Sequence, residues 1–149
     1  MMRHQRRRLG LLLSAFLVCS AMGCGGSDGP ELAAVSGTVR LDGEPLPGAD
    51  LLFIPENGSP SSGATDKDGY YYLRYSPSRD GAMPGKHTVR ISTYRPAHLD
   101  GEGKHLPGST EKLPPEYHRD SKLTQEVKSG KNTIDFDLKS GGKIVQPRE

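Results

Sequence analysis

Residues 35–73 begin V-S-G-T-V-R-L-D-G-E-P-L-P-G-A-D-L-L-F-I-P and, after a Gly/Ser-rich spacer, end G-A-T-D-K-D-G-Y-Y-Y-L. In residues 35–41, Val, Gly or Leu alternates with a polar residue, which is the period-two pattern of a half-buried strand. Three dipeptides predict tight turns, because Gly adopts positive φ and Pro fixes φ: Asp42-Gly43, Pro47-Gly48 and Asp68-Gly69. The stretch therefore predicts a compact antiparallel β domain. It contains no motif that indicates a chemical reaction.

The length and composition agree with one small β domain. A chain of 149 residues favours a single domain. Its 19 glycines and 12 prolines favour short strands and frequent turns over long helices. The hydrophobic fraction, 33%, is enough for one small core.

The first 23 residues are typical of a targeting segment. Residues 1–8 are positively charged and residues 9–18 are apolar. Because a membrane span needs about 20 apolar residues, the sequence predicts a secretory signal peptide over residues 1–23. Its removal takes away four arginines and no acid, so the net charge changes from +2 to −2. The remaining chain has no basic excess, and we expect no nucleic-acid partner.

The segment Ser20-Ala21-Met22-Gly23-Cys24 resembles the lipobox of bacterial lipoproteins. In a lipobox, cleavage leaves the cysteine as the new, lipid-modified N-terminus. The segment departs from the usual pattern at Ala21, where Leu is commonest. The alternative is ordinary signal-peptidase cleavage near Ala21 or Gly23, with Cys24 as a bystander thiol.

Two further features favour lipidation of Cys24. It is the only cysteine left after cleavage, because Cys19 lies in the apolar region, and a lone cysteine cannot form an internal disulfide. Residues 24–32 are rich in Gly and predict a flexible tether. Two or more acyl chains, palmitate among them, would hold the protein stably on a membrane. Gly26 is not the Asp that retains lipoproteins in the inner membrane of some bacteria, which favours the outer membrane of the cell envelope.

Seven short strands are predicted from alternation and turn signals: 35–41, 49–54, 63–65, 70–75, 85–93, 123–127 and 132–138. The clearest alternation places His87, Val89 and Ile91 on one face of a strand. We also expect Tyr71, Leu73, Tyr75, Ile134, Phe136 and Leu138 to point inward, and a hairpin turn at 129–132. Seven strands at this spacing are typical of a β-sandwich. Residues 140–149 read as a frayed C-terminal tail.

Residues 94–120 have four prolines, three glycines and no sustained period. A loop of this length inside a compact domain is usually functional or partly disordered. We therefore interpret it as a partner-binding loop, with candidate contact residues Tyr94, Arg95, His98, His105 and Tyr117. Tyr117 lies in a Pro-Pro-Glu-Tyr segment that would cover the edge of the sandwich.

The residues described so far resemble the carboxypeptidase regulatory-like domains. The matching pattern is Val35-x-Gly37-x-Val39, Asp42-Gly43-x-Pro45-Leu46-x-Gly48-Ala49-x-Leu51-x-Phe53, Thr65-Asp66-x-Asp68-Gly69-x-Tyr71-x-Leu73 and Pro84-Gly85-x-His87-x-Val89-x-Ile91. The position of His87 is more often Tyr in that family. The ending, Leu113-Pro114-Pro115-x-Tyr117 followed by strands, is similar to small lipoproteins of planctomycete-type bacteria.

This resemblance implies a seven-stranded antiparallel transthyretin-like (prealbumin-like) β-sandwich over residues 33–139. Such domains are accessory or surface modules without catalysis of their own. The hydroxyisourate hydrolases share the architecture, but their closing Tyr-Arg-Gly-Ser tetrapeptide is absent here. We therefore expect no hydrolase activity of that type.

The residues that could carry chemistry have simpler structural interpretations. Asp66-Lys67-Asp68-Gly69 resembles the start of a calcium loop, but Pro77 stands where an EF-hand needs Glu, so we interpret it as a hairpin turn. His98, His105 and His118 match no zinc spacing. We expect His87 to be partly buried with a hydrogen-bonded ring. No G-x-S-x-G elbow or glycine-rich phosphate loop occurs.

The sequence thus predicts a non-enzymatic, membrane-anchored envelope lipoprotein without cofactor or metal. Its expected role is structural or adhesive, through binding of an unidentified envelope protein. The alternative is a carbohydrate-binding module at the cell surface, with exposed tyrosines that stack on sugar.

Overall fold

The computed structural model describes residues 29–147. The predicted signal peptide, the lipidation residue Cys24 and the start of the tether lie outside these residues. The described chain is all-β, with thirteen strands and one short 3-10 helix, η1 (Pro115–Tyr117). The strands are β1 (Ala34–Leu41), β2 (Glu44–Pro45), β3 (Asp50–Pro55), β4 (Ser61–Ala64), β5 (Tyr70–Tyr72), β6 (Arg74–Ser76), β7 (Arg79–Asp80), β8 (Gly85–Ser92), β9 (His98–Leu99), β10 (His105–Leu106), β11 (Thr124–Val127), β12 (Lys131–Thr133) and β13 (Phe136–Leu138).

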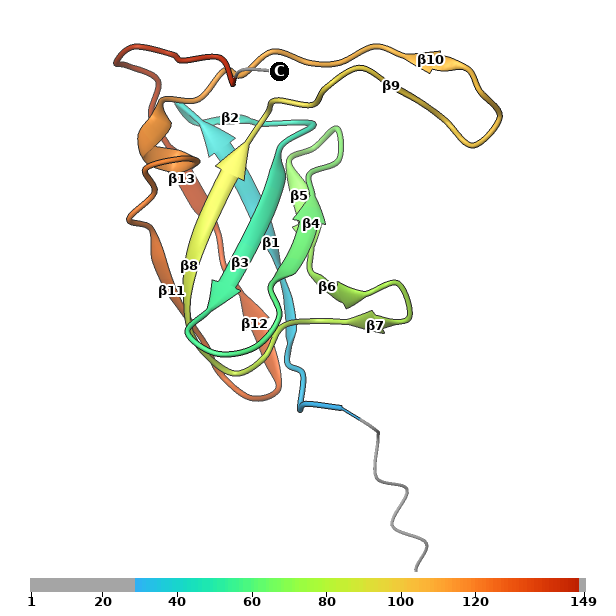
Figure 1. Ribbon diagram of the computed structural model, residues 1–149. Helices are drawn as coiled ribbons and strands as arrows, with labels where there is room; N and C mark the ends of the chain where they lie inside the picture. Colours follow the sequence, from blue (N-terminus) through green and yellow to red (C-terminus); the bar gives the residue numbers. More distant parts are fainter. Residues whose placement is uncertain (1–28, 148–149) are drawn as a thin grey trace, which may run out of the picture.

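The larger sheet has the strand order β11-β8-β3-β4-β6-β7 and is antiparallel throughout (Figure 1). Its centre is the long pairing of β3 with β8, in which Leu52 lies opposite Arg90. Leu52 also lies opposite Ser62 of β4, and Ser62 lies opposite Arg74 of β6. One row of residues therefore crosses four strands of this sheet.

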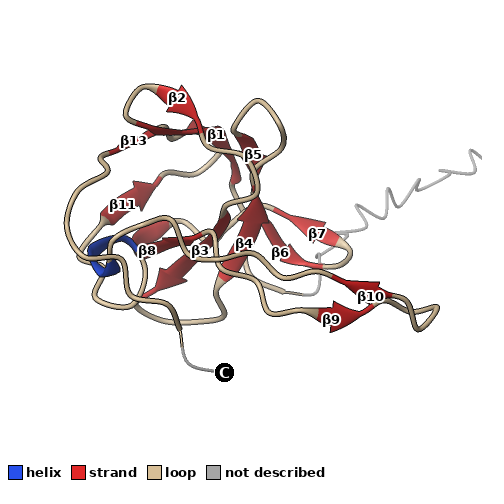
Figure 2. Ribbon diagram, turned by 90° about the horizontal axis from the view of Figure 1, so that it is seen from above, coloured by secondary structure: helices blue, strands red, loops and turns tan. Residues whose placement is uncertain are grey.

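The smaller sheet is built around β1, which pairs with β12, β13, β2 and β5. The pairings with β5 and β2 are antiparallel, but those with β12 and β13 are parallel. The prediction of a purely antiparallel sheet was therefore wrong. β9 and β10 form a separate two-stranded sheet that projects from the body of the domain (Figure 2).

The two sheets pack face to face over one shared apolar core. Phe53 of the larger sheet contacts Tyr71 and Phe136 of the smaller sheet, with ring centroids 6.4 and 6.1 Å apart. Full burial of one such side chain contributes about 1.5–3 kcal/mol. The core also contains the predicted inward residues Leu73, Val89, Ile91 and Leu138.

The predicted strand 70–75 splits into two strands that belong to different sheets. β5 pairs with β1 in the smaller sheet, and β6 pairs with β4 in the larger sheet. At the crossing point, the Leu73 N–H donates to Val35 O at 2.9 Å, and the Leu73 carbonyl accepts from the Gly81 N–H at 2.7 Å. Both backbone groups stay paired, so the chain changes sheets without losing a hydrogen bond.

Residues 123–138 also differ from the prediction. β11 pairs with β8 and β12 pairs with β1, so the turn between them joins the two sheets instead of closing a hairpin. The side chain of Asn132 accepts from Lys128 N–H at 2.9 Å and donates to Lys128 O at 2.7 Å, which stabilises this turn. Between β12 and β13, Asp135 Oδ1 accepts from the N–H and the hydroxyl of Thr38 at 2.7 and 2.9 Å. A carboxylate thus replaces a carbonyl in the ladder and interrupts the predicted strand.

The C-terminal tail is held against the domain, contrary to the expected fraying. The Gln146 side chain accepts from the Glu111 N–H at 2.8 Å and donates to the Glu111 carbonyl at 2.9 Å. This pair of bonds resembles a backbone ladder pair, so it orients the tail along the long loop. Within residues 29–147, no helix is long and apolar enough to cross a membrane.

Candidate functional site

The long segment after β8 is ordered, and it carries the hairpin β9–β10. Figure 1 shows this hairpin projecting at the end of the domain farthest from the point where the chain enters β1. In the hairpin, His105 lies opposite Leu99, and Leu106 lies opposite His98. Leu99 is 56% exposed, which makes it one of the most exposed large apolar side chains in the described part of the chain.

An ion pair fixes the base of the hairpin to the larger sheet. Arg95 Nε donates to Asp50 Oδ2 at 2.7 Å, and an Arg95 terminal nitrogen donates to Asp50 Oδ1 at 2.5 Å. The hydrogen bond that Arg95 donates to Asp50 raises the pKa of Arg95. Backbone bonds between Arg95 and Ser109 pair the two arms beside this point. The hairpin is therefore held at its base and free at its tip.

The buried carboxylate of Glu111 fixes the other half of the segment. It is 3% exposed and accepts hydrogen bonds from the Ser92 hydroxyl at 2.5 Å and the Thr93 hydroxyl at 2.8 Å. It also accepts three backbone N–H groups at 3.0 Å, from Thr93, Lys112 and Leu113. Burial raises the pKa of Glu111, but the hydrogen bonds from Ser92, Thr93 and Leu113 together outweigh burial and lower it. The group is thus a structural anion.

The five residues predicted to bind a partner divide into two groups. Arg95 forms an ion pair with Asp50, and Tyr94 is half-buried. Tyr117 packs against the core, and its hydroxyl accepts a hydrogen bond from Lys139 N–H at 3.1 Å. His98 and His105 are exposed on the hairpin, on facing strands. The structure therefore brings His98 and His105 together at an accessible surface, whereas the other three residues contact the domain itself.

The remaining candidate residues lie as follows. His87 is buried, and its Nε2 is 2.8 Å from the Met83 carbonyl, as a hydrogen-bonded ring requires. Asp66 Oδ1 accepts from the N–H groups of Asp68 and Tyr70, which is the geometry of a turn. His118 Nε2 is 3.2 Å from the Leu113 carbonyl. Among residues 29–147, no group of three His, Cys, Asp or Glu side chains is placed to share a metal ion.

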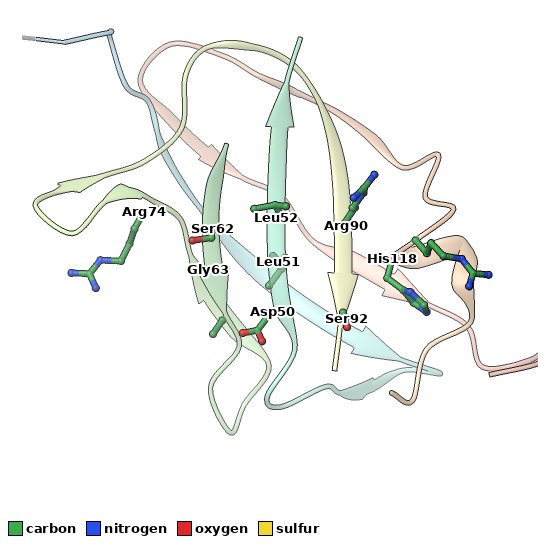
Figure 3. A pocket seen from close by; sticks show the side chains of 11 residues that line it. Asp50, Leu51, Leu52, Ser62, Gly63, Arg74, Arg90, Ser92 and His118 are labelled. Carbon is green, nitrogen blue, oxygen red and sulfur yellow. The ribbon is translucent and has the colours of Figure 1, made fainter. Parts of the chain in front are cut away.

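A second candidate surface, not predicted from the sequence, is a hollow of about 670 Å³ on the outer face of the larger sheet (Figure 3). Leu52 lies at its centre, and Ser62, Gly63 and Ala64 of β4 form one side. These small residues leave space above the sheet. Arg74, Arg90, Arg119 and His118 stand around the hollow.

The charges around the hollow are mostly cationic. Arg119 donates to the adjacent Asp120, and Arg74 is 3.4 Å from Asp80. Asp50 is neutralised by Arg95. The Arg90 side chain has no hydrogen bond or ion pair with any described residue. The alternation of β3, β4 and β8 signals which residues point outward, but the register that aligns them is not visible in the sequence.

A third surface carries two exposed tyrosines on β5. Tyr70 and Tyr72 are 45% and 50% exposed. They lie two residues apart in a strand and so point to the same face. A shallow hollow of about 240 Å³ beside them is lined also by Ser36, Asp80 and Lys131.

Comparisons with known proteins identify no family. No protein-family model matches the chain, and no curated protein matches it. Among solved structures, the chain is similar to a 9R-lipoxygenase from Cyanothece PCC8801, with a TM-score of 0.39 and 17% sequence identity. The match covers 74% of this chain and 16% of the lipoxygenase chain. A likeness this low carries no argument about fold or activity.

Proposed function

We propose that this protein is a non-enzymatic, membrane-anchored envelope lipoprotein with a structural or adhesive role. Its domain would be a seven-stranded transthyretin-like sandwich of the carboxypeptidase regulatory-like kind, anchored through a lipid on Cys24 in the outer membrane. The observation that carries the binding role is the projecting hairpin β9–β10, which is fixed at its base by Arg95 and Asp50 and presents Leu99 to solvent.

The placement of the hairpin supports this role. The Arg79 side chain donates to the Pro30 carbonyl at 2.6 Å, and Ala33 pairs with Ala82, so the chain enters the domain at a defined point. Figure 1 places that point and the hairpin at opposite ends of the domain. A lipid at Cys24 would therefore attach the membrane at the end of the domain opposite the hairpin, so that another envelope protein could reach the hairpin.

The polar cluster near the loop supports the absence of catalysis. Ser92, Glu111 and His118 lie close together, with His118 Nε2 4.0 Å from Glu111 Oε2. A nucleophilic serine must donate its proton to a base. The Ser92 hydroxyl donates to Oε2 of Glu111, whose Oε1 accepts three backbone N–H groups. Because the pKa of Glu111 is lowered, its carboxylate is a weak base for activating a serine. The cluster therefore serves the loop structure.

Photo-cross-linking in intact cells tests this proposal. A photoreactive amino acid replaces Leu99 at the hairpin, and a matched control carries it at exposed Lys128, near the other end of the domain. We expect one recurrent envelope protein linked from position 99 and not from position 128, together with a lipid-modified N-terminal Cys24. An N-terminal peptide that begins elsewhere without lipid would reject the anchor, and equal capture from both positions would reject the hairpin as the contact.

The tyrosine pair favours carbohydrate binding as a second candidate function. Two tyrosines exposed on one face of a strand can stack on sugar rings, and Asp80, Ser36 and Lys131 beside them can bond to hydroxyls. Retention of the protein on immobilised cell-wall polysaccharide tests this. The double variant Tyr70→Ala/Tyr72→Ala should lose retention, whereas Leu99→Ala should keep it. Equal retention of all three proteins would reject this function.

A further inference from the structure

The outer face of the larger sheet has an arginine at each end of one row. The row runs Arg90, Leu52, Ser62 and Arg74 across strands β8, β3, β4 and β6, as the pairing register requires. It forms the floor of the 670 Å³ hollow. Figure 3 shows Leu52 in the middle, with Arg90 and Arg74 on either side. The floor is therefore apolar at its centre and cationic at both ends.

The length of this row matches an extended peptide. Neighbouring strands lie about 4.8 Å apart, so the first and last residues of the row are about 14 Å apart. In an extended chain, residues i and i+4 are about 13 Å apart, and residues i, i+2 and i+4 point to the same face. A peptide that crosses the strands could therefore place two acidic side chains over the arginines and one apolar side chain over Leu52.

The charges of the hollow favour an anionic occupant. Arg90 makes no ion pair with any described residue, and its guanidinium offers a carboxylate a bidentate contact. Within residues 29–147, the Arg74 side chain bonds only to the exposed Asp80 at 3.4 Å and to the Pro77 carbonyl at 3.5 Å, both long contacts that a ligand can replace. The Asp50 carboxylate, the acidic group in the lining, is already paired with Arg95.

We propose that this hollow binds an acidic extended peptide of a partner protein, with the pattern acid–x–apolar–x–acid. The inference rests on the proposed protein-binding role and assigns a second surface to it. A glycan would prefer aromatic stacking partners, and none of the eleven lining residues is Phe, Tyr or Trp. A membrane surface would need exposed apolar side chains at the rim, where this hollow has arginines and a histidine.

Peptide binding to the purified full chain tests the inference. The probe is fluorescently labelled Gly-Glu-Ser-Leu-Ser-Glu-Gly, blocked at both ends and measured by anisotropy at low salt. One comparison peptide has the same composition with adjacent glutamates, and another has glutamine for both glutamates. Arg90→Gln is the test variant. Arg40→Gln is its matched control, because Arg40 is an exposed arginine on β1 of the other sheet.

We expect Arg90→Gln to weaken binding of the spaced peptide about tenfold or more, the loss typical of a charge-assisted hydrogen bond. Arg40→Gln should change it less than about twofold, as for a distant surface charge. Leu52→Thr should also weaken binding. Both Leu52→Thr and Arg90→Gln should keep the melting temperature of the wild type. The adjacent-glutamate and glutamine peptides should bind several-fold more weakly.

Four results would overturn the inference. Equal affinity for the spaced and adjacent peptides would show that the protein attracts them by charge alone. Equal losses of peptide affinity in Arg90→Gln and Arg40→Gln would show the same. Binding to phosphatidylglycerol vesicles, lost in Arg90→Gln, without peptide binding would assign the hollow to lipid. A hairpin partner in the cross-linking experiment with no peptide binding here would reject this inference alone, whereas peptide binding with no cellular partner would reject the proposed role.

Discussion

Thr93 donates both its backbone N–H and its hydroxyl to the same oxygen of Glu111, at 3.0 and 2.8 Å. These bonds join two residues that are 18 positions apart in the sequence, at the end of β8 and in the segment that leads to η1. The hairpin β9–β10 lies inside that loop. A buried carboxylate thus joins the two ends of a long and irregular segment, together with the Arg95–Asp50 pair at the base of the hairpin.

Glu111→Ala should destabilise the domain by about 2–5 kcal/mol. The change leaves buried N–H groups of Thr93 and Leu113 without an acceptor, and each such loss costs about 1–3 kcal/mol. Urea unfolding measures the free energy of unfolding. The matched control is Glu116→Ala, an exposed glutamate in the same segment, which should change stability by less than about 0.5 kcal/mol. Equal losses in the two variants would contradict the anchoring role of Glu111.

The pH dependence of stability should also trace to Glu111. Its folded pKa lies below the ordinary value of 4.5, so its contribution is fully present above that value and is lost as the pH falls through the lower folded pKa. Urea unfolding in a series of buffers from neutral to acidic pH should show this decline. Glu111→Gln should be less stable at neutral pH and should show a shallower decline. A decline of unchanged slope would place the responsible carboxylate elsewhere.

Gly37→Ala should be severely destabilising. A Cβ at this position would lie 1.9 Å from the Ile134 carbonyl oxygen, a backbone atom that cannot move without shifting β12 and β13. That carbonyl also accepts from the Tyr71 hydroxyl at 2.7 Å, so its displacement would break a second contact. Gly101→Ala, with open space around its Cβ, is the control and should melt as the wild type does. A melting temperature for Gly37→Ala within a few degrees of wild type would refute this close approach.

Phe53→Ala should cost about 3–5 kcal/mol of unfolding free energy, the usual range for removing a buried aromatic ring. Phe53 is fully buried and contacts Tyr71 and Phe136 across the two sheets. Leu99→Ala removes an exposed apolar side chain and should change stability by less than about 0.5 kcal/mol. A small loss for Phe53→Ala would mean that the sheets do not share this core.

Arg95→Ala should loosen the hairpin with little effect on global stability. The Arg95–Asp50 pair is partly exposed, and such pairs contribute only about 0–1 kcal/mol. Hydrogen exchange of the hairpin amides should speed up, because local opening no longer breaks this pair. Arg119→Ala, which removes a pair between adjacent exposed residues, should leave hairpin exchange unchanged. Faster exchange throughout the domain would indicate a global effect instead.

Local patterns in the sequence predicted much of the fold. The alternation of apolar and polar residues predicted β8, with His87, Val89 and Ile91 on its buried face. It also predicted which side of β13 is buried. Turn dipeptides found the boundaries around β1 and β3. These features depend on neighbours in sequence, so a single chain displays them. The all-β class follows from them directly.

The pairing partners could not be predicted in the same way. Nothing local shows that Leu73 is the point where the chain changes sheets, or that Asp135 replaces a ladder carbonyl for Thr38. The row that joins Arg90 to Arg74 depends on three strand registers. Glu111 lies in a segment without hydrophobic periodicity, so its burial could not be predicted from the sequence. Each of these features is a long-range contact.

The parallel pairing of β1 with β12 and β13 has a mechanical consequence. β1 is the first strand of the described chain, and it is hydrogen-bonded to other strands along both its halves. A pull on the N-terminal segment acts along β1 and loads these bonds in shear, so they must break together instead of one at a time. Such a domain would resist a pulling force applied through its N-terminal segment, because no single bond could break first.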